Sequence, residues 1–497
     1  MEYSGVIIIH ENYYLKKLIN LNLKENQFVY STDNNIEIPD VNHDILFREG
    51  INNQNRITYT PRMILYDLKE NINTFRTTDA LGNENCDYNW HSDKTQIFKE
   101  QKNQTSDFIS DLEKSEAEQL EAEIKNKRFK NINYLNQEYK MEQQVRYWPD
   151  YLKMKYHDRS YNTINQYQSF ESDSDPFEIY HYGSQVSKES GFMDNFEDKL
   201  RHYTEECNRL QGFQIMSDSF NGFGGLTNNC LNLITEEYAK RSVFTILPFP
   251  YFNNQKNDSK MIRLINTAFT LKGLLQDNKD NMALPISLFN SFLTSQKIQP
   301  VELPLVKYQP ELNYHTSAIL ASLIDSVTLP WRQKTQQNHM PDFFSSFDTY
   351  TYKIASLQSV YPLKINENKY LFNYLQDNDV CEIASWFTPL AASYLKCSEM
   401  TTSELLEGTF SVTCNGVEDA RVKNIKDNFV FGDIVPAKTV IQRYFEEMYP
   451  KSKTMSFSTK TALCTKLPFP NIIRDSTLKT AGHSKGKILI LTLWYHI

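Results

Sequence analysis

The sequence predicts an α/β protein with a parallel-sheet domain of the nucleotide-binding type, which contains a helical insertion and is followed by a smaller α+β domain. The run at residues 5–9 is continuously apolar, which is typical of a parallel strand covered on both faces, and residues 242–249 read as another buried strand. Residues 203–241 read as helix, strand, glycine-bearing turn and helix, the alternation that builds such sheets. Beyond Phe343 the pattern changes to α+β, with alternating residues at 409–413 typical of a half-buried strand.

Length and composition narrow the class of protein. The 497 residues suffice for two or three domains with sizeable cores, and 40% hydrophobic with 23% charged residues indicates a globular chain. The net charge of −8 offers no basic excess, so nucleic acid is not an expected partner. The chain has only 15 glycines, well below the usual ~7%. Because phosphate-cradling loops use glycine, this scarcity argues against a rich phosphate site.

Cysteine and histidine usage predicts no metal site and no disulfide framework. The seven cysteines are dispersed and form no C-x-x-C pair, as expected for reduced cytosolic thiols. The ten histidines show no metal-ligand spacing. The N-terminus lacks a basic segment before its short apolar run, and no apolar run reaches the ~18–20 residues of a membrane span. We therefore expect a cytoplasmic protein without a secretory signal or a transmembrane segment.

A glycine-bearing turn at residues 218–225 is the first candidate binding site. It follows an apolar strand at 210–216 and precedes a helix expected from Thr227, so backbone N–H groups and a helix N-terminus could face an anion. No Gly-Lys-Ser/Thr follows, so the turn is not a P-loop. A phosphate-binding loop and an ordinary tight turn both fit the pattern. The candidate residues are Asn221, Gly222, Gly224, Gly225 and Thr227.

Asp67 is a second candidate, at the carboxyl end of a strand predicted over residues 57–69. Ligands of α/β sheets collect at this end of the strands, so Asp67 could face a Mg²⁺–nucleotide. The alternative is a carboxylate that caps a helix or closes a turn.

Residues 101–146 form a charged stretch without glycine or proline, and they predict a helical insertion. Pairs such as Glu121–Lys125 have the i,i+4 spacing that supports a helix. A narrow apolar stripe fits either a solvated surface helix or a helix that binds a partner. The stripe consists of Phe108, Leu112, Leu120 and Ile124. The aromatic residues 145–152 that follow are expected to pack back on the core. Residues 181–192 read as a polar connection to the next helix.

Four ordered segments resemble the Misato family, the tubulin-related proteins of eukaryotes. They are YTPRMILYDLK at 59–69, EDKLRHYTEECNRLQGFQIMSDSFNGF at 197–223, RLINTAF at 263–269 and HTSAILASLIDSVTLPWR at 315–332. The resemblance extends from about residue 7 to residue 332 and is looser beyond. The last stretch, KGKILILTLWYHI at 485–497, looks unlike the family, as an alternative or truncated end would.

The resemblance implies a tubulin-like fold with an altered nucleotide pocket. Residues 10–15 lack the glycines of the first tubulin loop, and NGFGGLT at 221–227 stands where tubulins have GGGTGSG. There Phe223 and Leu226 would crowd an anion without bonding to it. Asn313 matches a tubulin asparagine that contacts the base, whereas residues 281–286 lack the other recognition asparagine. Residues 332–342 lack the loop that activates water in tubulin polymers.

The implied organisation is a first half of the α/β domain at 1–100, the insertion at 101–146, a tubulin-like core at 147–342 and an intermediate-type α+β domain at 343–497. No catalytic motif is present, so we expect a protein that is not an enzyme. The resemblance implies a role in mitochondrial distribution, morphology and fusion, with proteins of the mitochondrial outer surface as partners and a link to microtubules or the spindle. One alternative is a degenerate switch that binds GTP through Asp67, the retained glycines and Asn313. The other is a binding partner of tubulin or of its chaperones.

Overall fold

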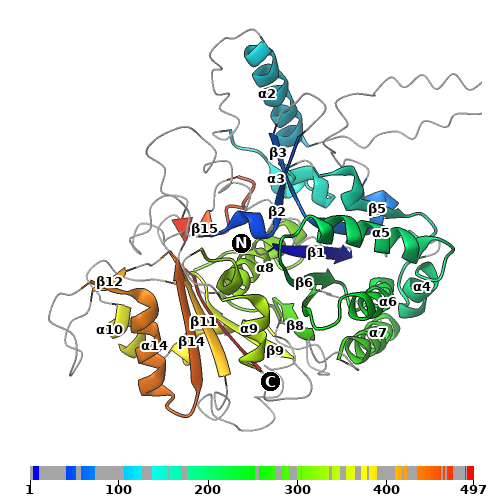
Figure 1. The fold of residues 1–497 in the computed structure, drawn as a ribbon. Helices are drawn as coiled ribbons and strands as arrows, with labels where there is room; N and C mark the ends of the chain where they lie inside the picture. Colours follow the sequence, from blue (N-terminus) through cyan, green and yellow to red (C-terminus); the bar gives the residue numbers. More distant parts are fainter. Residues whose placement is uncertain are drawn as a thin grey trace, which may run out of the picture.

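The computed structural model describes the chain in segments. These are residues 4–10, 41–51, 57–72, 106–124, 137–154, 156–168, 176–251, 257–275, 281–289, 299–303, 305–334, 338–347, 354–363, 371–377, 380–388, 409–416, 419–421, 434–459, 463–464, 467–473, 487–488 and 490–496. Figure 1 shows two main sheets, with helices beside both of them and between them.

A six-stranded parallel sheet forms the first half, in the order β5-β4-β1-β6-β7-β8. Its strands are β1 Ser4–His10, β4 Met63–Leu68, β5 Tyr161–Ile164, β6 Leu210–Ser217, β7 Ser242–Phe249 and β8 Asn281–Ser287. The predicted parallel sheet of a tubulin-like fold is thus confirmed. Pro285 lies in β8, an edge strand of this sheet, where a missing backbone N–H is tolerated.

The strand predicted over residues 57–69 is divided into two strands that belong to different sheets. β3 (Ile57–Pro61) pairs with β2 (Phe47–Ile51) in an antiparallel hairpin, and β4 begins at Met63 in the main sheet. Arg62 lies between them, and its buried guanidinium donates to the carbonyls of Asp44 and Phe47. These bonds hold the hairpin against the start of β4.

The two faces of the parallel sheet contribute side chains to two separate hydrophobic cores, because successive side chains of a strand point to opposite faces. In β6, Met216 packs with the long helix α8 (Asn313–Thr328), whereas Phe213 and Ile215 pack on the other face. Fourteen of the sixteen residues of α8 are buried, as expected for a helix that is apolar nearly all round.

Four helices cover the face opposite α8: α4 Tyr180–Val186, α5 Phe192–Glu205, α6 Gly222–Glu237 and α7 Asn257–Leu275. The expectation of a polar connection over residues 181–192 was wrong, because α4 occupies the first six of these twelve residues. Gly183 explains the difference: a Cβ there would lie 1.8 Å from the carbonyl oxygen of Gly222. The helix is stabilised by this close approach to α6, which its polar sequence does not reveal.

The second sheet contains five strands in the order β10-β9-β17-β11-β14. They are β9 Ala355–Val360, β10 Ser385–Trp386, β11 Thr409–Asn415, β14 Lys453–Thr459 and β17 Ile490–His496. Helices α10 (Leu371–Asp377) and α14 (Ala437–Met448) pack on its outer face. The apolar segment that looked foreign to the family contains β17, which lies between β9 and β11 in the middle of this sheet.

The helical insertion contains α2 (Asp107–Ile124), which projects from the top of the molecule in Figure 1. Phe108 and Leu112 at its base are buried, whereas the side chains of Leu120 and Ile124 and the Glu121–Lys125 pair lie outside the described residues. Trp148 and Tyr151 are buried, so the expected return of the aromatic stretch to the core is confirmed. The proposed domain boundaries themselves stay a prediction.

The remaining described elements are short. They are η1 His43–Ile45, η2 Lys69–Ile72, α3 Met141–Gln144, η4 Trp148–Tyr151, η5 Asp158–Ser160, η6 Leu329–Trp331, α9 Met340–Ser345, α11 Val380–Ile383, β12 Asp419–Arg421, β13 Ile434–Pro436, β15 Leu463–Cys464 and β16 Lys487–Ile488.

Candidate functional site

The glycine-bearing turn connects β6 to α6, but the helix begins earlier than its sequence predicts. α6 starts at Gly222 rather than Thr227, with Asn221 as the N-cap. The Asn221 side chain accepts a hydrogen bond of 3.0 Å from the backbone N–H of Phe223. This capping bond replaces one of the partners that the first helical turn lacks, so the helix can begin on a run of glycines.

The backbone donors that a phosphate would need are already bonded within the protein. The N–H of Gly222 donates to the carbonyl of Phe177 at 3.1 Å, and the N–H of Gly224 donates to the carbonyl of Asn221 at 3.3 Å. With the Phe223 N–H on the Asn221 side chain, three consecutive donors of the helix N-terminus have protein acceptors. A helix N-terminus binds anions through such donors. An anion would therefore have to displace these bonds.

The three glycines of this helix serve close packing. A Cβ at Gly222 would lie 2.7 Å from the Phe177 ring, which also packs edge-on against Phe223 with ring centroids 4.8 Å apart. A Cβ at Gly225 would meet the Tyr180 carbonyl oxygen at 2.1 Å, and one at Gly224 would meet a Thr270 hydroxyl at 2.1 Å. The space that each glycine leaves open is thus filled by α4, α7 or the segment before α4.

Thr227 and Asp218 complete the turn. The Thr227 hydroxyl is fully buried and donates to the Ser217 hydroxyl at 2.6 Å, which ties the helix to the end of β6. Asp218 lies at the mouth of the turn, 3.5 Å from the Asn221 amide nitrogen. A carboxylate at this position disfavours a bound phosphate by charge repulsion.

Asp67 is fully buried at the carboxyl end of β4, and its hydrogen bonds are internal. One carboxylate oxygen accepts from the Leu68 N–H and the Asn71 amide, both at 2.8 Å. The other accepts from the Trp148 indole at 2.9 Å. These contacts match a carboxylate that closes a turn and anchors the aromatic segment, the structural role weighed for it above.

Asn313 is the first residue of α8 and its side chain is exposed. Next to it, Tyr314 lines a cleft of about 580 Å³, a volume within the range of small-ligand sites. None of the seven candidate nucleotide residues lines this cleft. The hydrogen bonds described for Asp67 involve neither the turn nor Asn313, and nucleotide binding by these residues stays a prediction.

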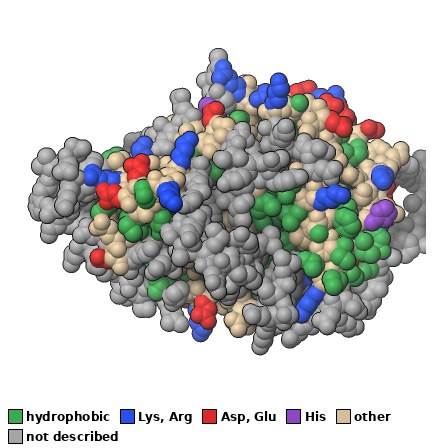
Figure 2. Space-filling model, turned by 90° about the horizontal axis from the view of Figure 1, so that it is seen from below, with side chains coloured by type: hydrophobic (Ala, Val, Ile, Leu, Met, Phe, Trp, Pro, Cys, Tyr) green, Lys and Arg blue, Asp and Glu red, His purple; other side chains and the backbone are tan. Residues whose placement is uncertain are grey.

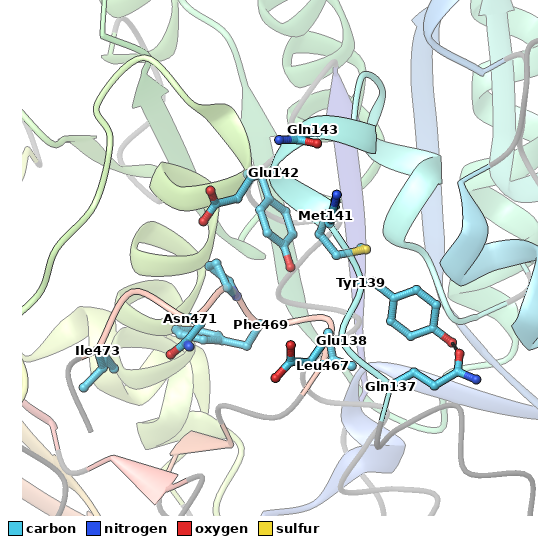
Figure 3. A pocket seen from close by; sticks show the side chains of 13 residues that line it. Gln137, Glu138, Tyr139, Met141, Glu142, Gln143, Leu467, Phe469, Asn471 and Ile473 are labelled. Atoms are coloured by element: carbon cyan, nitrogen blue, oxygen red, sulfur yellow. Dashed lines mark hydrogen bonds between the residues drawn. The ribbon is translucent and has the colours of Figure 1, made fainter. Parts of the chain in front are cut away.

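The cleft lies between two segments more than 300 positions apart. Figure 3 shows Tyr139, Met141 and Glu142 on one side, and Phe469 and Asn471 on the other. The second side is tied to α8, because the Tyr314 hydroxyl donates to the Pro468 carbonyl at 2.6 Å. Sequence reasoning missed this cleft, because no motif marks either segment and only the fold brings them together.

A buried histidine ties the wall of the cleft to α8. His315 accepts the Gln309 N–H at its Nδ1 atom (3.2 Å), and its Nε2 atom lies 2.9 Å from the Glu142 carboxylate. With Nδ1 accepting, the ring proton belongs on Nε2 and points to Glu142. This contact holds α3 on the first turn of α8.

Among the residues that the structure describes, no group of three or more His, Cys, Asp or Glu side chains is placed to hold a metal ion. In the same part of the chain, no helix combines the length and the hydropathy needed to cross a bilayer.

Comparisons with known proteins agree with this architecture. A tubulin domain model matches residues 138–333, and a model described as a Misato Segment II tubulin-like domain matches residues 20–114. "Protein misato homolog 1" of Bos taurus is 28% identical over 460 residues, covering 87% of this chain and 77% of that protein. "Protein misato" of Drosophila melanogaster is 27% identical, covering 86% and 76%. "Protein misato homolog 1" of Homo sapiens is 30% identical over 322 residues, covering 61% and 55%.

Proposed function

Because this chain belongs to the Misato family of tubulin-related proteins, we propose that it is a non-catalytic, tubulin-like scaffold. In this proposal it regulates mitochondrial distribution, morphology and fusion, and it acts on the cytosolic face of the mitochondrial outer membrane. The proposal extends to a link with microtubule or spindle organisation. The mitochondrial part rests on the family resemblance, and the non-catalytic part rests on the site.

The non-catalytic part of the proposal is supported by the hydrogen bonds at the N-terminus of α6. The N–H groups of Gly222, Phe223 and Gly224 all have acceptors within the protein. A Cβ at Gly222 would lie 2.7 Å from the Phe177 ring, so the space beside this glycine is already filled. Charge-assisted bonds to phosphate contribute about 1.5–3 kcal/mol each, so losing three would weaken binding by several orders of magnitude.

Calorimetry with GTP and GDP in the presence of Mg²⁺ tests the non-catalytic part. We expect no binding at millimolar nucleotide and no phosphate release above the buffer rate. Binding at micromolar nucleotide would overturn this part and favour the GTP-dependent switch. A substitution at Gly224 is a poor test, because any Cβ there meets Thr270 and would unfold the turn before it changed a ligand site.

Complementation of cells that lack their own Misato protein tests the mitochondrial part. We expect the full chain to restore the mitochondrial network and a fraction of it to co-purify with mitochondria. A folded, expressed chain that leaves the network unchanged would contradict this part. Pelleting with microtubules addresses the remaining alternative, because direct binding to the polymer would favour a tubulin partner over a mitochondrial scaffold.

A further inference from the structure

Helix α7 carries an exposed apolar surface that the proposed function does not use. Met261, Ile265 and Phe269 are 58%, 47% and 53% exposed, and they recur at intervals of four residues on one side of the helix. Ile179 is 40% exposed at the start of α4, beside Tyr180, whose ring packs on Phe269 at 5.6 Å. We call these four side chains, with the exposed Ala268, the α7 patch. Figure 2 shows the hydrophobic side chains gathered on this face of the molecule.

The composition of this solvent face is unusual for a surface helix. From Ser259 to the end of α7, six residues are exposed: four belong to the α7 patch and the others are Lys260 and Lys272. Helix α5 covers the same face of the sheet, and its exposed residues are Asp194, Asn195, Asp198, Arg201 and Glu205. A surface helix normally keeps polar residues outward, as α5 does. The outward face of α7 therefore has the composition of a contact surface.

The inner face of α7 shows that this outward face is not a misplaced core face. Arg263, Asn266, Thr267 and Thr270 are buried. Asn266 and Thr270 donate to carbonyls of the neighbouring turn, Thr267 donates to the Arg263 carbonyl of its own helix, and the Arg263 guanidinium lies over the Phe220 ring. The Asn266 amide donates to the carbonyls of Glu178 and Phe220 at 2.6 and 2.9 Å. The helix thus buries a largely polar face and exposes an apolar one. Rotating it about its axis would break these bonds, so the exposed face is fixed.

We infer that the α7 patch docks on a lipid bilayer with anionic headgroups. This inference rests on the proposed function at the mitochondrial outer membrane, and it identifies the lipid surface as the binding partner of the patch. Met261, Ile265 and Phe269 would enter the boundary between headgroups and acyl chains. Lys260 and Lys272, near the two ends of the patch, would contact the phosphates. An interfacial helix binds in this way, with apolar side chains inserted and basic residues at headgroup level.

Two features favour a bilayer over a protein partner. The exposed area of the four large side chains is roughly 400 Å², about half of what each partner buries in a standard protein interface. A few inserted side chains with flanking lysines nevertheless suffice for weak, reversible membrane binding. The exposed charges of α7 with described side chains are both positive, which matches anionic lipid.

Flotation of the purified full chain with vesicles tests this inference. We expect binding to phosphatidylcholine vesicles that contain phosphatidylserine, and weaker binding to phosphatidylcholine alone. The double variant Ile265→Ser/Phe269→Ser should bind at least about tenfold more weakly, because two large apolar side chains are lost from the boundary. Lys260→Gln/Lys272→Gln should remove most of the preference for the anionic vesicles and its salt dependence.

Two control variants distinguish insertion of the α7 patch from nonspecific adsorption of exposed apolar side chains to the vesicles. Met448→Ser and Ile57→Ser remove side chains that are 45% and 58% exposed on α14 and β3. Both should bind vesicles as the unchanged chain does. Unchanged circular dichroism and melting of every variant would show that the fold is retained.

The outcomes distinguish the inference from the proposed function. No binding of the unchanged chain to either vesicle, or equal binding by the α7 patch variant, overturns the lipid inference. If the Ile265→Ser/Phe269→Ser variant is no longer recruited to mitochondria although the unchanged chain does not bind vesicles, the patch binds a protein. That result would likewise overturn the lipid inference. If vesicle binding depends on the patch but the chain fails to restore mitochondrial shape, the inference holds and the proposed function fails.

Discussion

The indole nitrogen of Trp148 donates a hydrogen bond of 2.9 Å to the buried carboxylate of Asp67, across 81 positions of sequence. The bond joins the end of β4 to the aromatic segment that follows the charged insertion. It also uses one oxygen of the carboxylate that the sequence presents as a candidate Mg²⁺–nucleotide ligand. The fold therefore gives Asp67 a partner from its own chain.

Replacing either residue should lower stability, because the other would be left with a buried polar group lacking its partner. We expect Asp67→Ala to cost about 3 kcal/mol or more and Trp148→Phe about 1.5–3 kcal/mol in urea unfolding. A double-mutant cycle should give a coupling of about 1 kcal/mol or more. Glu118→Ala, on the exposed side of α2, should be neutral. Additive effects of the two substitutions would show that the bond is not important for stability.

Adding one methyl group at Gly225 should be costly although alanine favours helices. A Cβ there would lie 2.1 Å from the Tyr180 carbonyl oxygen, which belongs to backbone and cannot rotate away. We expect Gly225→Ala to destabilise the protein by about 1–3 kcal/mol, since overpacking forces α4 and α6 apart.

Asn232→Ala on the exposed side of the same helix is the matched control, and it should leave the melting temperature equal or slightly higher. Equal melting of Gly225→Ala and the unchanged chain would contradict the packing role of this glycine.

Stability should fall on mild acidification because of His43. Burial, together with the nearby charges of Arg332 and Lys334, lowers the pKa of His43 from 6.5 to about 3. In the unfolded chain the His43 imidazole takes up a proton as the pH drops below 6.5. In the folded chain the same imidazole stays neutral until about pH 3. The native state should therefore lose about 2 kcal/mol between pH 7 and pH 5 from this residue.

His43→Gln isolates this contribution, because it removes the titrating group from the same site. The difference in unfolding free energy between pH 7 and pH 5 should be smaller in the variant by about the same 2 kcal/mol. Equal differences in the two proteins would mean that His43 is protonated or solvated in the native state.

The strand β17 should be essential to the second sheet. Leu493 is fully buried, and its strand pairs on both sides, with Gln358 of β9 and Val412 of β11. We expect Leu493→Ala to cost about 2–5 kcal/mol through the cavity it leaves. Met448→Ala, 45% exposed on α14, should cost little by comparison. A small effect of Leu493→Ala in thermal unfolding would argue against a central position for this strand.

Local pattern alone determined much of the fold. The mostly apolar runs of β6 and β7 predicted buried strands, because a strand covered on both faces is largely apolar on both. The long apolar α8 was likewise evident, and the resemblance to tubulin-related proteins followed from ordered segments. These features are local or collinear, so they can be seen without knowing which segments meet.

Only the tertiary structure decided what the candidate site residues do. Phe177, Tyr180 and Thr270 fill the space beside three glycines that a sequence pattern shows only as open. The Trp148 indole donates a hydrogen bond to the carboxylate of Asp67. Helix α4 forms from a polar stretch because Gly183 allows it to approach α6 closely. Each outcome depends on contacts between distant segments, where steric fit and buried hydrogen bonds outweigh local preference.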